Sequence, residues 1–287
     1  MYVHYYIRLP ESVSALIYIT FTLYYTAINP FYGVAAVILF ILYDRSMRRK
    51  EGLTGRIPKV VYQTWNSNTL PPKMAECRSE LQEANPDFTF ELYDDAACRS
   101  FIQTHFEPDV AKAYDTLLPG AFKADLWRYC VLYENGGIYL DIKFKCEPGF
   151  SLNTLVEKPT FIREYHYTGK GLYDHIMYTG CISAYPKNPL FMKCIRQIVE
   201  NCETKYYGPE HTSPTGPYLF ASMMDPDDIE GGEYSYYETD GIGHIRHIEN
   251  KHVILSHYPE YRSEQKTFNP SSYWKDAWAK KEVYASL

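Results

Sequence analysis

The residues of this chain best suited to chemistry lie between positions 125 and 143. Asp125 and Arg128 are three residues apart in a stretch with helical spacing of apolar residues, so their side chains are neighbours on one helix surface. Tyr139, Asp141 and Lys143 follow at every second position, which places them on one face of a strand. Carboxylates beside a guanidinium and an ammonium group could hold sugar hydroxyls, a diphosphate and a metal ion. This combination predicts a binding site.

Two adjoining elements must position these side chains. Apolar residues recur at helical spacing from Pro119 to Tyr133, and Asn135-Gly136-Gly137 then ends the predicted helix, because glycine adopts the left-handed conformation of a C-cap. From 138 to 145 the pattern changes to alternation, which predicts a strand with one apolar and one polar face. The apolar face carries Ile138, Leu140, Ile142 and Phe144, and the polar face carries Tyr139, Asp141, Lys143 and Lys145.

This stretch resembles a known family. Asp125, Arg128 and the run Gly136-Gly137-Ile138-Tyr139-Leu140-Asp141 are similar to A-D-x-x-R-x-x-x-L-x-x-x-G-G-x-Y-x-D-x-D, the pattern of the DXD sugar-binding glycosyltransferases of family 32. Its best-known members are the initiating mannosyltransferases of the fungal Golgi, and the clostridial glucosylating toxins share the same core. The resemblance implies an α/β fold of the GT-A (Rossmann-like) type, a nucleotide-sugar donor and a retaining mechanism. In one departure, Lys143 stands where the family usually has the second aspartate of D-x-D.

The resemblance and the chemistry of glycosyl transfer suggest individual roles. The departing nucleoside diphosphate gains negative charge, which a divalent cation held by carboxylate oxygens can neutralise. We expect Asp141 to bind Mn²⁺ or Mg²⁺ directly, Asp125 to accept hydrogen bonds from sugar hydroxyls, and Arg128 to meet sugar or phosphate oxygens. Lys123 and Tyr139 are further candidates for donor binding.

Lys143 makes the metal uncertain and leaves two hypotheses open. It could pair with the diphosphate itself and so replace part of the role of the metal. Alternatively it lies to one side, and Asp141 holds a weaker metal site with water and phosphate oxygens, which we favour. In many metal-using transferases of this architecture a C-terminal histidine completes the metal shell, which makes His257 a candidate, although a lone histidine is more often structural.

An earlier segment predicts the nucleotide site. The run from Ile57 to Trp65 is a short apolar strand that ends in polar residues, and it resembles the I-P-K-x-I-x-Q-T-W opening of the family. Ligands of open α/β sheets bind beyond the carboxyl ends of strands. Gln63, Thr64 and Trp65 are therefore predicted to contact the donor, although a buried core tryptophan is the alternative.

The remaining segments predict an α/β domain with a mostly parallel sheet in three layers. Thr215 and Gly216 match a T-G-P of the family that lines the donor or acceptor cleft, but a helix N-cap followed by proline in the first turn accounts for most of the motif. Asp94 is read as a helix N-cap and not as a metal ligand, and Asp225–Gly243 as a surface excursion. The expected elements are helices at 74–84, 96–106, 189–203 and 218–224, strands at 88–93, 160–163 and 180–185, and a last strand pair at 244–255.

Composition excludes some classes of function. The net charge is −6 and the basic residues are scattered, which argues against nucleic acid as a partner. The chain has seven cysteines and no C-x-x-C, so a structural zinc site is not expected.

The N-terminal part predicts attachment to a membrane. Residues 12–43 are almost uncharged, which fits one kinked transmembrane helix or a hairpin turning at Asn29-Pro30; a soluble helix pair is the alternative. We expect residues 1–52 to form the anchor and basic linker, and 53–287 to form the GT-A-like domain. The cluster Arg45, Arg48, Arg49, Lys50 and Arg56 favours a cytoplasmic catalytic domain. The family resemblance instead implies the Golgi lumen.

The sequence is therefore compatible with three functions. The first is a membrane-anchored retaining glycosyltransferase that moves a sugar, with mannose as one candidate, to a glycan, lipid or protein acceptor. The second is a degenerate relative that binds sugar nucleotide or glycan without turnover. A third, a glycoside hydrolase, would need Asp125 and Asp141 to face each other across a bond, and the nucleotide-type first strand argues against it.

Overall fold

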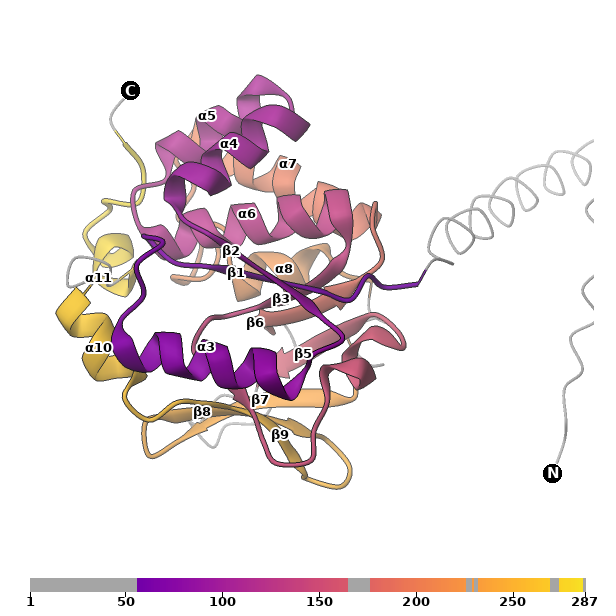
Figure 1. Cartoon of the computed structure of the whole chain (residues 1–287). Helices are drawn as coiled ribbons and strands as arrows, with labels where there is room; N and C mark the ends of the chain where they lie inside the picture. The colour runs from indigo at the N-terminus through magenta and orange to yellow at the C-terminus, as the bar shows by residue number, and fades with distance from the viewer. Residues whose placement is uncertain (1–55, 165–175, 226–228, 230–231, 269–273, 286–287) are drawn as a thin grey trace, which may run out of the picture. The chain divides into compact units, whose positions relative to one another are not determined.

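The computed structural model describes residues 56–164, 176–225, 229, 232–268 and 274–285, all within the compact unit Gly55–Leu287 (Figure 1). Within these residues no helix is both long and apolar enough to cross a bilayer. The predicted anchor at 12–43 lies outside the described residues.

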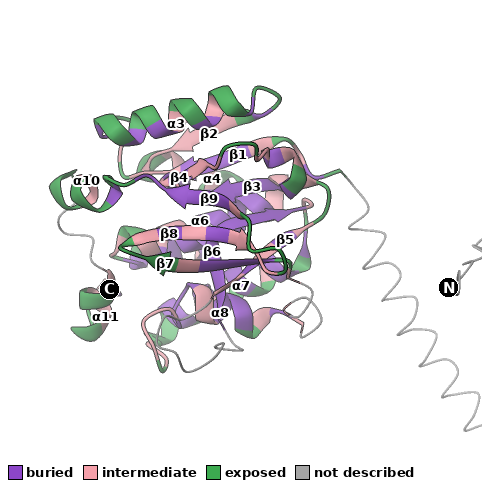
Figure 2. Ribbon diagram, turned by 90° about the horizontal axis from the view of Figure 1, so that it is seen from below, coloured by how far each residue is buried: buried purple, intermediate pink, exposed green. Residues whose placement is uncertain are grey.

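One nine-stranded mixed sheet forms the centre of the unit, in the order β2-β1-β3-β6-β5-β7-β8-β9-β4. The strands are β1 (Val60–Thr64), β2 (Thr89–Tyr93), β3 (Gly137–Leu140), β4 (Phe144–Cys146), β5 (Thr160–Glu164), β6 (Met177–Ala184), β7 (Tyr234–Thr239), β8 (Ile242–His247) and β9 (Val253–His257). Figure 2 shows that β3 and β6 are buried along their whole length.

Helices cover both faces of this sheet. The larger core lies between the sheet and α4 (Asp95–His105), α5 (Pro108–Thr116), α6 (Gly120–Asn135), α7 (Pro189–Thr204) and α8 (Pro217–Met223). On the other face, α3 (Pro72–Ala84) packs against β4 and exposes its outer side (Figures 1 and 2). The short helices η1 (Leu152–Val156), α10 (Tyr261–Phe268) and α11 (Trp274–Ala279) complete the described unit.

The central helix and its end agree with the prediction. Helix α6 is capped by Gly136, whose φ of 66° is left-handed and whose N–H donates to the carbonyl of Leu132. A side chain at Gly136 would also lie 2.6 Å from the backbone nitrogen of Pro186. Glycine is therefore required there by conformation and by space.

The expectation of a mostly parallel sheet is wrong. Only the pairs β1–β2, β1–β3 and β5–β7 are parallel among the described strands, and the other five pairs are antiparallel. Strands β7, β8 and β9 follow each other through tight connections, with Asp240 and Gly241 both at positive φ between β7 and β8. Tight hairpins give antiparallel pairs, whereas parallel pairs need long crossovers.

Two local expectations are also corrected. The surface excursion expected at Asp225–Gly243 contains strand β7, in which Tyr234, Ser235 and Tyr236 are buried. The single strand expected at 138–145 is interrupted at Asp141–Lys143, between β3 and β4. The N–H of Asp141 still donates to Gly180 of β6, but the N–H of Phe144 turns back to the carbonyl of Asp141.

The interruption has a topological cause. Strand β3 lies in the interior of the sheet order and β4 at its end, yet only the turn 141–143 joins them. The sheet must therefore curl until its last strands come near β3. The turn, with Asp141 and Lys143, therefore lies where the last strands of the curled sheet approach β3.

Candidate functional site

A cavity of about 350 Å³ opens beside the turn between β3 and β4. Most of the site residues predicted from sequence line this cavity, and they come from β1, α6, the β3–β4 segment and the start of α8. They are Thr64, Trp65, Asp125, Arg128, Tyr139, Asp141, Lys143 and Gly216.

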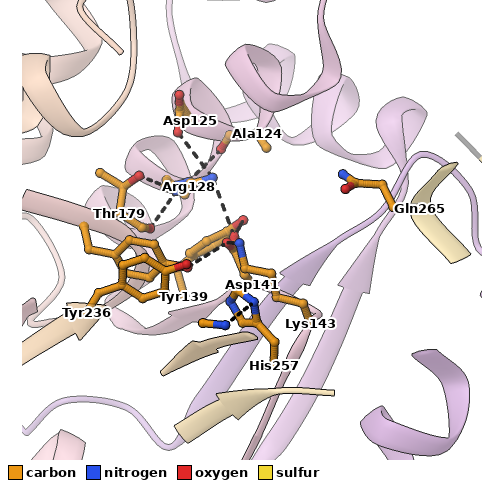
Figure 3. A network of polar contacts seen from close by, with 12 residues as sticks. Ala124, Asp125, Arg128, Tyr139, Asp141, Lys143, Thr179, Tyr236, His257 and Gln265 are labelled. Atoms are coloured by element: carbon orange, nitrogen blue, oxygen red, sulfur yellow. Dashed lines mark hydrogen bonds and ion pairs between the residues drawn. The ribbon is translucent and has the colours of Figure 1, made fainter. Parts of the chain in front are cut away.

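Arg128 connects the two predicted carboxylates (Figure 3). Its Nη2 lies 3.3 Å from Oδ1 of Asp125 and 3.8 Å from Oδ1 of Asp141. Its Nη1 donates to the carbonyl and the hydroxyl of Thr179, at 2.6 and 2.7 Å. The guanidinium also lies over the ring of Tyr139, 4.3 Å from its centroid. All of these partners are protein groups, so the N–H groups of the buried guanidinium are already occupied. The role of Arg128 is therefore to position Asp125 and Asp141.

Both oxygens of Asp141 have partners. Oδ1 accepts a hydrogen bond from the hydroxyl of Tyr139 at 2.8 Å, and Oδ2 lies 2.9 Å from Nζ of Lys143. The hydroxyl of Tyr178 lies 3.5 Å from Oδ2. Burial would raise the pKa of Asp141, but the charges of Lys143 and Arg128 outweigh it and lower the pKa to about 2. Asp141 is therefore ionised at neutral pH.

Asp125 is held from the opposite side. Its Oδ2 accepts a hydrogen bond from Oγ1 of Thr215 at 2.7 Å. A Cβ at Gly216 would lie 3.1 Å from the same oxygen, so glycine leaves room for the carboxylate. Burial raises the pKa of Asp125, although Arg128 and Thr215 oppose the shift.

The remaining predicted residues lie outside the cavity lining. Gln63 is fully buried, and its amide atoms have no hydrogen-bond partner among the described residues. Lys123 places Nζ 5.0 Å from the ring centroid of Tyr114. Thr215 lies behind Asp125. His257 is buried beside the ring of Phe144, 4.7 Å away.

The residues present do not fit a divalent cation. Among the described residues no group of three or more His, Cys, Asp or Glu could hold a metal. Nδ1 of His257 accepts the N–H of Gly243, so Nε2 of the neutral ring carries the proton and offers no lone pair. Burial and the charge of Lys143 lower the pKa of His257 to about 2, which keeps the ring neutral.

Several cavity residues were missed by sequence reasoning. Tyr261, Arg262 and Gln265 come from α10, and Trp274 and Lys275 from α11. The carboxylates of Glu164, Glu210 and Glu238 also line the cavity. Burial and the charge of Glu210 raise the pKa of Glu164 to about 7. Glu164 directly follows the strand predicted at 160–163, so a polar residue at a strand end was the available signal.

Comparison with known families agrees with the resemblance predicted from sequence. A sequence profile for the family described as "Glycosyltransferase sugar-binding region containing DXD motif" matches residues 71–162. This range contains α6 and Asp141, and the predicted resemblance is confirmed.

Curated relatives match the same part of the chain. Inositol phosphoceramide mannosyltransferase 3 of Schizosaccharomyces pombe is 29% identical over 141 residues, covering 46% of this chain and 39% of the relative. A mannosyl phosphorylinositol ceramide synthase of Saccharomyces cerevisiae is 29% identical over 172 residues, covering 58% of this chain and 42% of the relative. The initiation-specific alpha-1,6-mannosyltransferase of Candida albicans is 33% identical over 91 residues, covering 30% of this chain and 24% of the relative. The matches thus span less than half the length of these relatives.

A solved structure named PaToxG glycosyltransferase matches with a TM-score of 0.44 and 17% identity, covering 64% of this chain and 75% of that one. A similarity of this size carries no functional argument.

Proposed function

We propose that this chain, whose residues 71–162 match the DXD-containing glycosyltransferase family, transfers a hexose from a nucleoside-diphosphate sugar to a glycan, lipid or protein acceptor. The observation that carries the proposal is the cluster of Asp125, Arg128 and Asp141 on the wall of one cavity. Two carboxylates fixed by one guanidinium present their oxygens at set positions, which suits a ligand rich in hydroxyl groups.

Each side chain then has a defined task. Asp125 and Asp141 accept hydrogen bonds from sugar hydroxyls and so orient the anomeric carbon. Lys143, on the same wall, supplies positive charge where the diphosphate departs. Arg128 is a positioning residue, because its N–H groups are directed at Asp125, Asp141 and neighbouring protein oxygens.

Retention of configuration by front-face attack is part of the proposal. A double displacement needs a carboxylate oxygen that can bond to the sugar. Both oxygens of Asp125 and of Asp141 have hydrogen-bond or ion-pair partners within the protein. The sharing of Arg128 by these carboxylates also argues against the hydrolase alternative, in which they would face each other across the substrate.

Mannose and a lipid acceptor are the first candidates for the substrates. The relatives from the two yeasts carry names that specify mannose transfer and inositol-containing ceramide lipids. A lipid acceptor also agrees with the anchor predicted at 12–43. We propose that the anchor holds the catalytic unit at the cytoplasmic face, as the basic residues after the tract favour. Protease digestion of sealed membrane vesicles, with and without detergent, tests this orientation.

Donor turnover provides the central test. The full-length chain, purified in detergent, is incubated with UDP- and GDP-sugars and an inositol-containing ceramide lipid, and released nucleoside diphosphate is measured. We expect one donor to be consumed, and Asp141→Asn to reduce turnover by at least about a hundredfold. Asp87→Asn is the matched control, because Asp87 is exposed and paired with Lys59 away from the cavity. NMR of the product reports whether the configuration is retained.

The second candidate function is binding without turnover, favoured by the replacement of the second aspartate with Lys143. A folded chain that binds a nucleotide but consumes no donor with any acceptor would establish it. Failure to bind any nucleotide would contradict the transferase, and failure to bind either a nucleotide or a glycan would contradict both candidates.

A further inference from the structure

We infer that the diphosphate of the donor is bound by two side chains of this protein, Lys143 and Arg262, and that this binding needs no divalent cation. The inference rests on the proposed function and specifies how its donor is held.

The first observation concerns the charge around Asp141. In a D-x-D site, two aspartates supply oxygens and negative charge to the metal. Here Oδ2 of Asp141 is paired with Lys143 at 2.9 Å, and Oδ1 accepts from Tyr139 and lies near Arg128. The charges of Asp125 and Asp141 are thus balanced by those of Arg128 and Lys143. Among these four residues no excess negative charge remains to attract a divalent cation.

The second observation is a pair of cations over one aromatic ring. Nζ of Lys143 lies 5.7 Å from the ring centroid of Tyr261, and Cζ of Arg262 lies 5.4 Å from the same centroid. Both side chains line the cavity. Arg262 therefore adds a positive charge to a cluster that is already balanced, and the wall formed by these residues is cationic.

The partners of the two cations leave capacity for an anion. Nη1 of Arg262 donates to Oε1 of Gln265 at 3.0 Å, and no carboxylate pairs with Arg262 within the described part of the chain. Lys143 has one carboxylate partner, Asp141, and rings of Phe144, Tyr178 and Tyr261 within 5.8 Å. Aromatic faces stabilise an ammonium group without neutralising it. Its other N–H groups can therefore donate to phosphate oxygens.

The neighbouring carboxylates do not occupy these cations directly, although the charge of Lys143 acts on Glu164. Glu164, Glu210 and Glu238 line the same cavity, but in the described structure none of them forms an ion pair with Lys143 or Arg262. A nucleoside diphosphate fits this wall because its oxygens can meet an ammonium and a guanidinium group together.

Calorimetry of nucleotide binding tests the inference without relying on turnover. GDP and UDP are titrated into the full-length chain in detergent, once with EDTA and once with Mn²⁺. We expect the better-binding nucleotide to have the same Kd, within about twofold, in both conditions. Lys143→Ala and Arg262→Ala should each raise this Kd by about tenfold or more, as expected for a lost charged hydrogen bond.

Two further variants of the same stretch sharpen the test. Lys145→Ala is the matched control, because Lys145 lies on β4 outside the cavity lining, and its Kd should not change. Lys143→Asp restores two carboxylates in a D-x-D spacing and removes the competing cation. Nucleotide binding to this variant should require Mn²⁺.

The outcomes separate the inference from the proposed function. Metal-independent binding that is lost in Lys143→Ala and Arg262→Ala supports both. Binding of GDP or UDP to the unaltered chain only when Mn²⁺ is present overturns the inference and leaves the glycosyltransferase proposal standing. Metal-independent binding that Lys143→Ala and Arg262→Ala leave unchanged also overturns it. If neither nucleotide binds in either condition, the inference and the proposed function both fail.

Discussion

Oδ2 of Asp125 lies 2.7 Å from Oγ1 of Thr215, although ninety residues separate them in the chain. The first side chain comes from the middle of α6 and the second from the turn before α8. With Arg128 on its other oxygen, the carboxylate of Asp125 is held between two partners and has a defined orientation in the cavity wall.

This relationship predicts different effects for two substitutions of Thr215. Thr215→Val keeps the shape but removes the hydroxyl donor from a buried carboxylate, so it should lower the free energy of unfolding by about 1–3 kcal/mol and weaken donor binding. Thr215→Ser keeps the hydroxyl, so its loss of stability should be less than half of the loss in Thr215→Val. Chemical denaturation of both variants measures the difference, and equal stabilities would contradict the assigned role of the hydroxyl.

A substitution at Gly180 should disturb Asp141 directly. A Cβ at this position would lie 2.5 Å from Oδ2 of Asp141 and closer still to the hydroxyl of Tyr178, so Gly180→Ala must displace these side chains or the strand. We expect turnover to fall by about tenfold or more, because the reacting groups lose their alignment. Turnover at the unaltered rate in Gly180→Ala would show that the position of Asp141 is unimportant.

The lowered pKa of Asp141 predicts a loss of stability in acid. Its pKa is about 2 in the folded protein, below its ordinary value, so its ionised form stabilises the fold. This contribution, about 2 kcal/mol, is complete above pH 4 and is lost as the pH falls from 4 towards 2. The difference in unfolding free energy between the unaltered chain and Asp141→Asn should therefore shrink from pH 6 to pH 2.5. A difference that does not depend on pH would contradict the assignment.

The contribution of Glu164 to stability should change with pH in the opposite direction. Burial and Glu210 raise its pKa to about 7, so the fold favours the protonated form. The stability associated with protonation is present below pH 4.5 and is lost as the pH rises towards 7 and above. Glu164→Gln should therefore be more stable than the unaltered chain at pH 8, by about 1–2 kcal/mol. The gain is no larger because solvent screens part of the effect. At pH 4.5 the variant should be no more stable than the unaltered chain. Denaturation at the two pH values measures this, and an equal effect at both would count against the raised pKa.

Part of the fold could be predicted because its signals are local. The apolar spacing of α6, its glycine cap at Gly136 and the N-cap of α4 by Asp94 depend on residues within a few positions of each other. The carboxylate of Asp94 accepts the N–H of Ala97, as predicted for an N-cap. Strands β1 and β2 were also expected, because short apolar runs between turns define them.

The remainder depended on pairings between distant segments. The segment Asp225–Gly243 is acidic and glycine-rich, which predicts a surface excursion. Its strand β7 is instead buried at Tyr234 and Tyr236, because β5 and β8 lie on either side of it. The turn at Asp141–Lys143 could not be foreseen either. It arises because the curled sheet brings β9 to β4, not because of any turn residue within the segment.

The sequence by itself determined which side chains carry the chemistry and which of them share a helix or strand, because those relationships follow from periods of 3.6 and 2 residues. The tertiary structure decided their partners. Arg128 meets Thr179, Asp125 meets Thr215, and Arg262 lies over the same ring as Lys143 only after segments far apart in the chain have packed together. The pairs Asp125–Arg128 and Asp141–Lys143 are local in the chain. The approach of Arg128 to Asp141 and the addition of Arg262 to the cluster are properties of that packing.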